Sequence, residues 1–255
     1  MKNKIANIAK LSLVFILICF NQSCQDALDE VVVSAIPNAY INTPKGLDDA
    51  TAAAYTSLRS FYGTERGHNL TAFGTDTYTN GADGSFKFMN TYTTQFDSQV
   101  SHLRELWEEF YRGINTCNAI IERSVAVTGI SETIKKQRVA EAKFIRAHHY
   151  FILTQVFGGV DLRLTETVSP TKDAKRATIA AQYTAIIKDL NEAIPDLEAK
   201  AKSAQYGRVT KPAAEMLLAK VYMTKAGSEA KASDDFSKAV PLLQSVVTNY
   251  GLKLL

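Results

Sequence analysis

Cysteine is scarce in this chain, which has three in 255 residues. Two of them, Cys19 and Cys24, lie near the N-terminus, and the third is Cys117. If the N-terminal segment is cleaved and Cys24 is modified, Cys117 is left alone and cannot form an internal disulfide. A packed apolar core must then stabilise the fold. We expect Cys117, which lies in a helical apolar pattern, to be a small buried hydrophobe rather than a catalytic thiol.

Long apolar runs are also scarce. Residues 11–20 form a nearly unbroken apolar run, but about ten residues cannot cross the ~30 Å of hydrocarbon in a bilayer. Lys2, Lys4 and Lys10 precede this run and supply a positive N-terminal region. The pattern predicts that residues 1–23 are a signal peptide. No later apolar run reaches membrane length.

Charge of one sign is not in excess. The full chain has 29 Lys and Arg against 26 Asp and Glu, a formal net charge of +3. Residues 1–23 hold three lysines and no acid, so the net charge of the remainder is 3 − 3 = 0. A neutral chain with scattered charges has no electrostatic footprint for nucleic acid, and we expect no nucleic-acid partner.

Recognisable reaction centres are lacking as well. The four histidines show no HExxH spacing, and no GxSxG turn or phosphate-binding glycine loop is present. We therefore expect no catalytic residues, no metal site and no cofactor, and a protein that is not an enzyme. His148 lies one helical turn after Phe144 and one turn before Phe151 and Ile152. This spacing favours a histidine that is buried in the core. Glu141 and Arg146 in the same segment are interpreted as structural ion-pair or cap partners.

What the sequence does contain is helical apolar periodicity. After an extended leader over residues 24–44, Thr43 and Pro44 open a helix that Gly63 ends. Residues 63–97 are predicted to be a long loop, because glycine, threonine and aromatic residues are mixed there. Further helices are predicted over residues 99–124, 131–157, 179–199, 210–226 and 233–249.

The predicted helices follow one another in pairs, 99–124 with 131–157 and 179–199 with 210–226. Small residues in the second members would let helices approach closely: Ala140, Ala142, Ala147, Ala213, Ala214 and Ala219. This arrangement predicts an all-α fold of degenerate tetratricopeptide-like antiparallel helix pairs with long loop insertions, because the spacing exceeds the usual repeat of about 34 residues.

The N-terminal motif and several later segments resemble a known family. Ser23-Cys24 is similar to the lipobox of bacterial lipoproteins, in which the cysteine thiol is lipidated, although Asn21 and Gln22 depart from its usual pattern. Ordered segments resemble the SusD/RagB family of outer-membrane nutrient-binding lipoproteins: residues 58–63, 107–115, 140–147, 150–151, 156–160, 176–178, 187–194, 207–214 and 217–222. An ordinary secretory signal with Cys24 as a free thiol is the alternative interpretation of the first motif.

The resemblance implies three parts: a signal peptide over 1–23, a lipidated Cys24 with its extended leader over 24–44, and a SusD-like helical domain over 45–255. It covers only the N-terminal portion of a typical member, so the chain is expected to be a fragment or a truncated product. The acidic residues Asp26, Asp29 and Glu30 follow Cys24 and resemble the surface-export signals of some outer-membrane lipoproteins. A solvated tether would explain them equally well.

As a family member, the protein would be a lipid-anchored, cell-surface protein of the outer membrane. It would bind a glycan and deliver it to a SusC-like TonB-dependent channel. The alternatives are a helical-repeat scaffold for protein interactions and a peptide-binding lipoprotein.

Sugar binding requires aromatic faces and directional polar groups. The predicted loop offers both, so the candidate ligand-binding residues are Asp76, Tyr78, Asn80, Asp83 and Phe86. The same aromatics would also serve to hold the loop against the helical body. Trp107 lies on the apolar stripe of its predicted helix, and we expect it in the core.

The lipid anchor gives a direct test. In Cys24→Ser, the thiol that would carry the lipid is absent, so we expect the protein to move from the membrane fraction to the soluble fraction. Fractionation followed by immunoblotting measures this. A Cys24→Ser variant that remains fully membrane-bound would refute the anchor.

Overall fold

The computed structural model describes residues 38–79, 81, 84–202, 204 and 206–252. In this part of the chain the structure is helical, with one isolated antiparallel bridge between Asp161 and Arg176. The all-α prediction is confirmed. The longer helices are α2 (Pro44–Tyr62), α5 (Ser101–Arg123), α6 (Glu132–Phe157), α7 (Ile179–Ala193), α8 (Lys211–Ala226) and α9 (Asp235–Asn249). Shorter elements are α3 (Glu65–Thr71), α4 (Lys87–Thr91) and the 3-10 turns η2 (Asn38–Asn42), η3 (Ser124–Ala126) and η4 (Ile194–Asp196).

The helix boundaries follow from the capping residues. The Thr43 hydroxyl accepts a hydrogen bond from the Gly46 amide at 3.0 Å and starts α2. Ser131 starts α6 in the same way, accepting from the Ile134 amide at 3.3 Å. Gly158, with φ of 72°, ends α6 in a conformation that favours glycine. These predicted starts and ends are confirmed.

Three predicted elements differ from the structure. The leader predicted to be extended to residue 44 contains the 3-10 turn η2 (Asn38–Asn42) in its described part, and α2 begins at Pro44. Residues 63–97 were predicted to be one long loop, but they contain α3 and α4. Thr64 caps α3, and its hydroxyl accepts from the Arg66 amide at 3.3 Å. The helix predicted over 179–199 ends at Ala193 and continues as η4, because Pro195 lacks an amide hydrogen and disfavours a helical residue before it.

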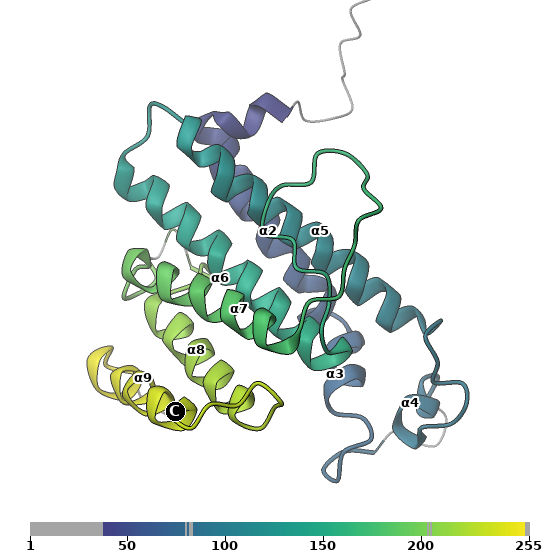
Figure 1. The fold of residues 1–255 in the computed structure, drawn as a ribbon. Helices are drawn as coiled ribbons and strands as arrows, with labels where there is room; N and C mark the ends of the chain where they lie inside the picture. Colours follow the sequence, from purple (N-terminus) through teal and green to yellow (C-terminus); the bar gives the residue numbers. More distant parts are fainter. Residues whose placement is uncertain (1–37, 80, 82–83, 203, 205, 253–255) are drawn as a thin grey trace, which may run out of the picture. The chain divides into compact units, whose positions relative to one another are not determined.

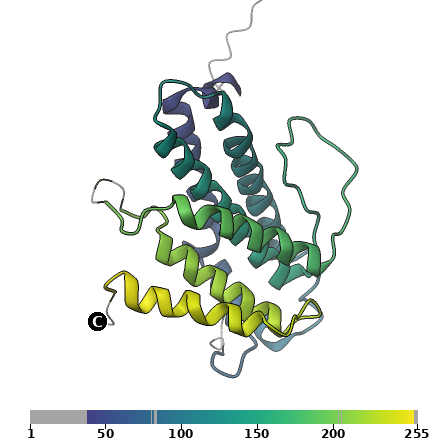
Figure 2. The same cartoon turned by 60° about the vertical axis from the view of Figure 1, so that its left-hand side comes forward.

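Consecutive long helices lie side by side from α2 through α5, α6, α7 and α8 to α9 (Figure 1). Their axes turn progressively, so that α7, α8 and α9 cross below the more upright earlier helices (Figure 2). The predicted contact of α5 with α6 is confirmed. The predicted contact of α7 with α8 is present but is less extensive than two others. α7 packs more extensively on α6, and α8 packs more extensively on α9.

Small side chains allow the close approach at these contacts. Ala140 of α6, Ala193 of α7 and Ala214 of α8 are all buried in one cluster. Ala213 points outward and is exposed, unlike the prediction. Cys117 is fully buried in α5, and burial raises the pKa of its thiol to about 12, so it is the expected small hydrophobe.

Arg146 of α6 joins three helices. Its Nε and Nη2 donate to the two carboxylate oxygens of Asp189 in α7 at 2.8 and 2.7 Å. Its Nη1 donates to Asn118 Oδ1 in α5 at 2.7 Å and to the Leu164 carbonyl at 3.1 Å. Both charged side chains are buried. The structural role expected for Arg146 is confirmed.

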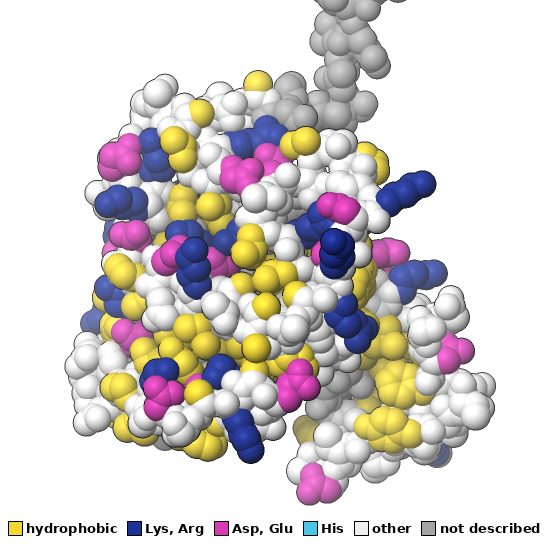
Figure 3. Space-filling view, in the orientation of Figure 1, with side chains coloured by type: hydrophobic (Ala, Val, Ile, Leu, Met, Phe, Trp, Pro, Cys, Tyr) yellow, Lys and Arg dark blue, Asp and Glu magenta, His cyan; other side chains and the backbone are white. Residues whose placement is uncertain are grey.

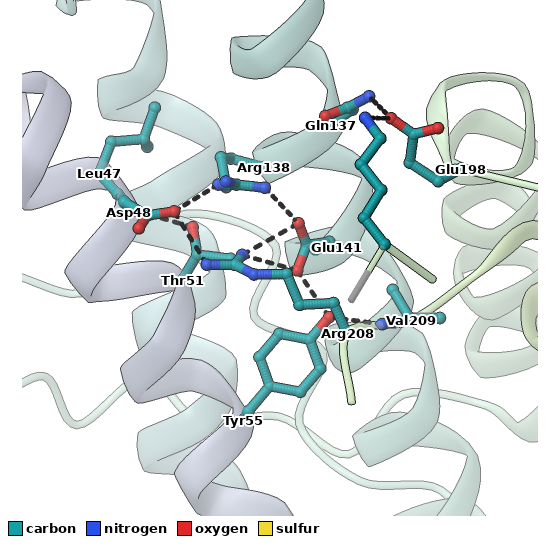
Figure 4. A network of polar contacts seen from close by, with 11 residues as sticks. Leu47, Asp48, Thr51, Tyr55, Gln137, Arg138, Glu141, Glu198, Arg208 and Val209 are labelled. Atoms are coloured by element: carbon teal, nitrogen blue, oxygen red, sulfur yellow. Dashed lines mark hydrogen bonds and ion pairs between the residues drawn. The ribbon is translucent and has the colours of Figure 1, made fainter. Parts of the chain in front are cut away.

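A second polar network joins α2 and α6 to the segment that precedes α8 (Figure 4). The buried Glu141 carboxylate accepts from the Tyr55 hydroxyl at 2.7 Å, from Arg138 at 2.8 Å and from Arg208 at 3.0 Å. Asp48 accepts from the same two arginines, at 2.7 Å from Arg138 and 2.9 Å from Arg208. Glu141 is therefore a structural ion-pair partner, as predicted.

Two adjacent histidines of α6 lie in the core. His149 Nε2 is 2.7 Å from Ser57 Oγ, and His148 Nε2 is 2.7 Å from the Tyr62 hydroxyl. A Cβ at Gly113 would lie 2.6 Å from both His149 Nε2 and Ser57 Oγ, so only glycine fits where α5 crosses them. Burial lowers the pKa of His148 to about 4 and that of His149 well below its usual value. The prediction of a core histidine at His148 is confirmed.

The buried pair of Arg146 and Asp189 predicts that substitutions at neighbouring positions of α7 differ in their effect on stability. Asp189→Ala leaves the Arg146 charge buried without its carboxylate, so we expect the free energy of unfolding to fall by about 3–5 kcal/mol. Lys188→Ala removes an exposed pair with Glu192 at 3.9 Å and should change stability by less than about 0.5 kcal/mol. Urea unfolding followed by circular dichroism measures both variants. Equal effects at the two positions would contradict the structural role of the pair.

Candidate ligand-binding site

The segment between α3 and α5 is organised around Gly74. This glycine has φ of 72°, and its amide donates to Asn90 Oδ1 at 3.3 Å. A Cβ there would lie 2.4 Å from Cε2 of Tyr92. The absence of a side chain at Gly74 therefore lets the Tyr92 ring lie against the backbone on the other side of the loop.

Tyr92 has an unusual backbone conformation. It ends α4 with φ of 51° and ψ of 43°, and it is the only non-glycine residue with positive φ in the described part of the chain. Its side chain is 65% exposed, and its ring centroid lies 5.9 Å from that of Phe96. Non-glycine residues held in this region cluster at functional sites.

A cavity of about 510 Å³ separates this segment from the helical body. We call it the loop cavity. The segment contributes aromatic and apolar side chains, and α5, α6 and α8 form the opposite wall. The lining includes Phe73, Met89, Tyr92 and Phe96 on one side and Leu103, Phe151, Phe157, Lys220 and Thr224 on the other. Figure 3 shows apolar side chains gathered on the part that carries α4, at the lower right.

The loop cavity combines the two features that a sugar site requires. Phe73, Tyr92 and Phe96 supply aromatic surface. Gln155 of α6 and Lys220 of α8 also line the cavity and supply polar groups. Gln155 is exposed, and its amide donates to the Tyr183 hydroxyl at 3.0 Å. The volume lies within the range of roughly 300–1,000 Å³ that is usual for small-molecule sites.

Of the residues predicted from sequence, Asp76, Tyr78 and Phe86 do not line this cavity. Asp76 and Tyr78 are exposed, and the Tyr78 ring meets His68 edge-on with centroids 5.1 Å apart. The Phe86 ring packs 4.0 Å from that of His102, centroid to centroid. Asn80 and Asp83 lie outside the described residues. A ligand-binding role for these five residues stays a prediction.

Sequence reasoning did not select the aromatics that line the cavity. Phe73, Tyr92 and Phe96 share with Tyr78 and Phe86 the same glycine-rich and polar surroundings. Spacing in an irregular segment does not tell which ring faces the helical body. The approach of the Tyr92 ring to Gly74, which distinguishes it, depends on the three-dimensional path of the loop.

The prediction that Trp107 lies in the core is wrong. Its side chain is 38% exposed, at the edge of α5 where the apolar stripe passes beyond the covering helices. The ring lies 4.7 Å from that of Tyr111, one turn later, and meets Phe157 edge-on at 5.3 Å.

Comparison with known proteins identifies the family. The family model described as starch-binding and associating with the outer membrane, a SusD-like family, matches residues 26–223. The chain belongs to the SusD-like family. The sequence-based recognition is thereby confirmed, and the family's description associates its members with the outer membrane.

Individual relatives agree with this assignment. A SusD-like protein of Bacteroides ovatus is 27% identical over 267 residues, covering 100% of this chain and 46% of the relative. A laminarin-binding SusD-like protein of known structure is 27% identical with a TM-score of 0.69, covering 84% of this chain and 46% of that one. A structure determined with xylogluco-oligosaccharide is 25% identical with a TM-score of 0.66, covering 82% and 41%.

The chain therefore spans less than half the length of the curated relatives that it matches. Within its described residues, no helix is long and apolar enough to cross a membrane. In the same residues, no group of three or more His, Cys, Asp or Glu side chains is placed to hold a metal ion.

The positions of Tyr78 and Phe86 predict different effects on stability. Phe86→Ala removes a ring packed on the buried His102 and should lower the free energy of unfolding by roughly 1–3 kcal/mol. Tyr78→Ala removes an exposed ring and should change it by less than about 0.5 kcal/mol. Urea unfolding of both variants measures this difference. If Phe86→Ala is as stable as the parent, the ring does not anchor the segment.

Proposed function

We propose that this protein binds a glycan, an oligosaccharide or polysaccharide, at the outer membrane and delivers it to a SusC-like TonB-dependent channel. The observation that carries the proposal is the loop cavity, in which Phe73, Tyr92 and Phe96 face polar groups of α6 and α8. Pyranose rings present apolar faces that stack on aromatic side chains, while their hydroxyls require donors and acceptors.

The family supports the same ligand class. It is described as starch-binding, and two of the related structures concern laminarin and xylogluco-oligosaccharide. These ligands differ in their sugars and linkages, so they support a glycan without fixing which one. A binding role rather than catalysis also agrees with the polar clusters of α6, where Glu141 and Arg146 are engaged in ion pairs between helices.

The membrane association would come from Cys24, which lies outside the described residues. A lipid on this cysteine, followed by the leader over residues 25–44, would hold the helical domain beside the channel at the cell surface.

A binding assay with a matched aromatic control tests the proposal. The purified chain is titrated with soluble starch, laminarin and xyloglucan oligosaccharides by isothermal calorimetry. We expect at least one to bind. Tyr92→Ala should weaken binding roughly fivefold to tenfold, because the cavity loses a stacking face. Tyr206→Ala removes a ring that is 90% exposed and does not line the loop cavity, so its affinity should stay within about twofold.

The same assay separates the alternatives. Binding that survives Tyr92→Ala but is lost in Tyr78→Ala would move the site to the residues predicted from sequence. A chain that binds no glycan in the panel but co-purifies with an outer-membrane barrel would overturn glycan binding in favour of a protein-interaction scaffold.

A further inference from the structure

A second hollow lies further along α5. It has a volume of about 400 Å³ and is formed between α5 and the connection from α6 to α7. We call it the Trp107 cleft. Trp107, Tyr111 and Asn115 line it from α5, at successive turns of the helix. The connection contributes the opposite side with Asp161, Arg163, Thr167 and Thr171.

The aromatic side of the Trp107 cleft is a fixed surface. The rings of Trp107 and Tyr111 lie 4.7 Å apart with an angle of 37° between their planes. The Tyr111 hydroxyl donates to the Asp161 carbonyl at 2.6 Å, and the edge-on contact with Phe157 supports Trp107. Trp107 is nevertheless 38% exposed. A large aromatic surface is thus held in place and accessible.

The polar side is held by contacts among its own residues. Arg163 donates to Asp161 Oδ2 at 2.5 Å and to Asp173 Oδ1 at 2.8 Å. Asn115 bonds the backbone of Thr167 twice, accepting from its amide at 2.7 Å and donating to its carbonyl at 3.1 Å. Because these charges are already paired with one another, the cleft favours a neutral ligand rich in hydroxyl groups over a charged one.

A third hollow of about 360 Å³ shares lining residues with both the Trp107 cleft and the loop cavity. This hollow is lined by Leu103, Trp107 and Phe157, together with charged groups at its edge. Leu103 and Phe157 also line the loop cavity, and Trp107 also lines the cleft. The three hollows therefore follow one another along α5, with shared walls.

We infer that the Trp107 cleft is a second glycan subsite, in which a pyranose ring stacks on the indole of Trp107 and its hydroxyls bond Asp161 and Arg163. An extended oligosaccharide then lies along α5 and contacts both Tyr92 in the loop cavity and Trp107 in the cleft. This inference rests on the proposed glycan binding. It adds Trp107 as a binding residue and specifies that the ligand is extended. The ligand is a chain of several sugar rings rather than a single sugar.

Trp107 is the only tryptophan of the chain, so tryptophan fluorescence reports on this cleft directly. The unmodified protein is titrated with soluble starch, laminarin and xyloglucan oligosaccharides. Its fluorescence emission is recorded with excitation selective for the indole. We expect a saturable change in emission with the glycan that binds, at the same midpoint concentration as calorimetry gives. Mono- and disaccharides of the same glycan should bind at least tenfold more weakly, because they cannot reach both aromatic surfaces.

Substitutions test the stacking itself. Trp107→Phe keeps an aromatic face and should keep affinity within about threefold. Trp107→Leu keeps apolar contact with Tyr111 and Phe157 but loses the flat face, and should weaken the long glycan roughly threefold to tenfold. Met216→Ala, at an exposed apolar residue of α8 that lines none of the three hollows, is the control and should leave affinity unchanged. Thermal unfolding of each variant verifies that it is folded.

The outcomes separate this inference from the proposed function. If a glycan binds and Tyr92→Ala weakens it, but the Trp107 emission does not change and Trp107→Leu binds normally, the second subsite is refuted and glycan binding stands. If Trp107 emission responds only to an outer-membrane protein, the cleft is a protein interface and the inference is wrong. If none of the three glycans binds by either method, both fail.

Discussion

The fold depends on the buried ion pair between Arg146 and Asp189. A guanidinium taken out of water needs a full set of acceptors, and α5, α6 and α7 must lie at fixed separations to supply them. The same arginine orients Asn118, whose amide donates to the carbonyls of Arg163 and Thr165. The irregular connection from α6 to α7 is thus positioned by the pair, although it has little regular structure of its own. This connection forms one wall of the Trp107 cleft. The buried ion pair in the core therefore also determines the geometry of the cleft.

These interactions also explain why the family is easier to recognise than the ligand. The segments that carry the resemblance contain the residues that hold the helices together. Glu141 in one segment meets Arg208 in another, 67 positions later, and Arg146 meets Asp189 in a third. Such contacts restrict residue type at defined positions in the sequence. The aromatics of the loop cavity lie in an irregular segment, where no helical period fixes which ring lines the cavity.

The sequence predicted the long helices because their ends are local events. Thr43, Ser131 and Gly158 act through hydrogen bonds and dihedral angles within a few residues. Contacts between distant segments were not predictable in this way. The periodicity that placed Trp107 on an apolar stripe was real, but whether a neighbouring helix covers that turn depends on how the helices cross. In the candidate site, the aromatic and polar character of the segment was predicted, whereas the position of the Tyr92 ring against Gly74 and at the wall of the loop cavity required the structure.

The histidine pair in α6 limits the conditions under which this fold is stable. His148 and His149 are neutral in the core, where burial disfavours the charged form, and an unfolded chain would protonate them near pH 6.5. Below that pH the unfolded state binds more protons than the folded state, so stability falls as the pH decreases from about 6.5 toward the pKa of His148, about 4. Their contribution is fully present above pH 6.5. The helical core therefore favours neutral surroundings, and acidification acts on it from within through this histidine pair.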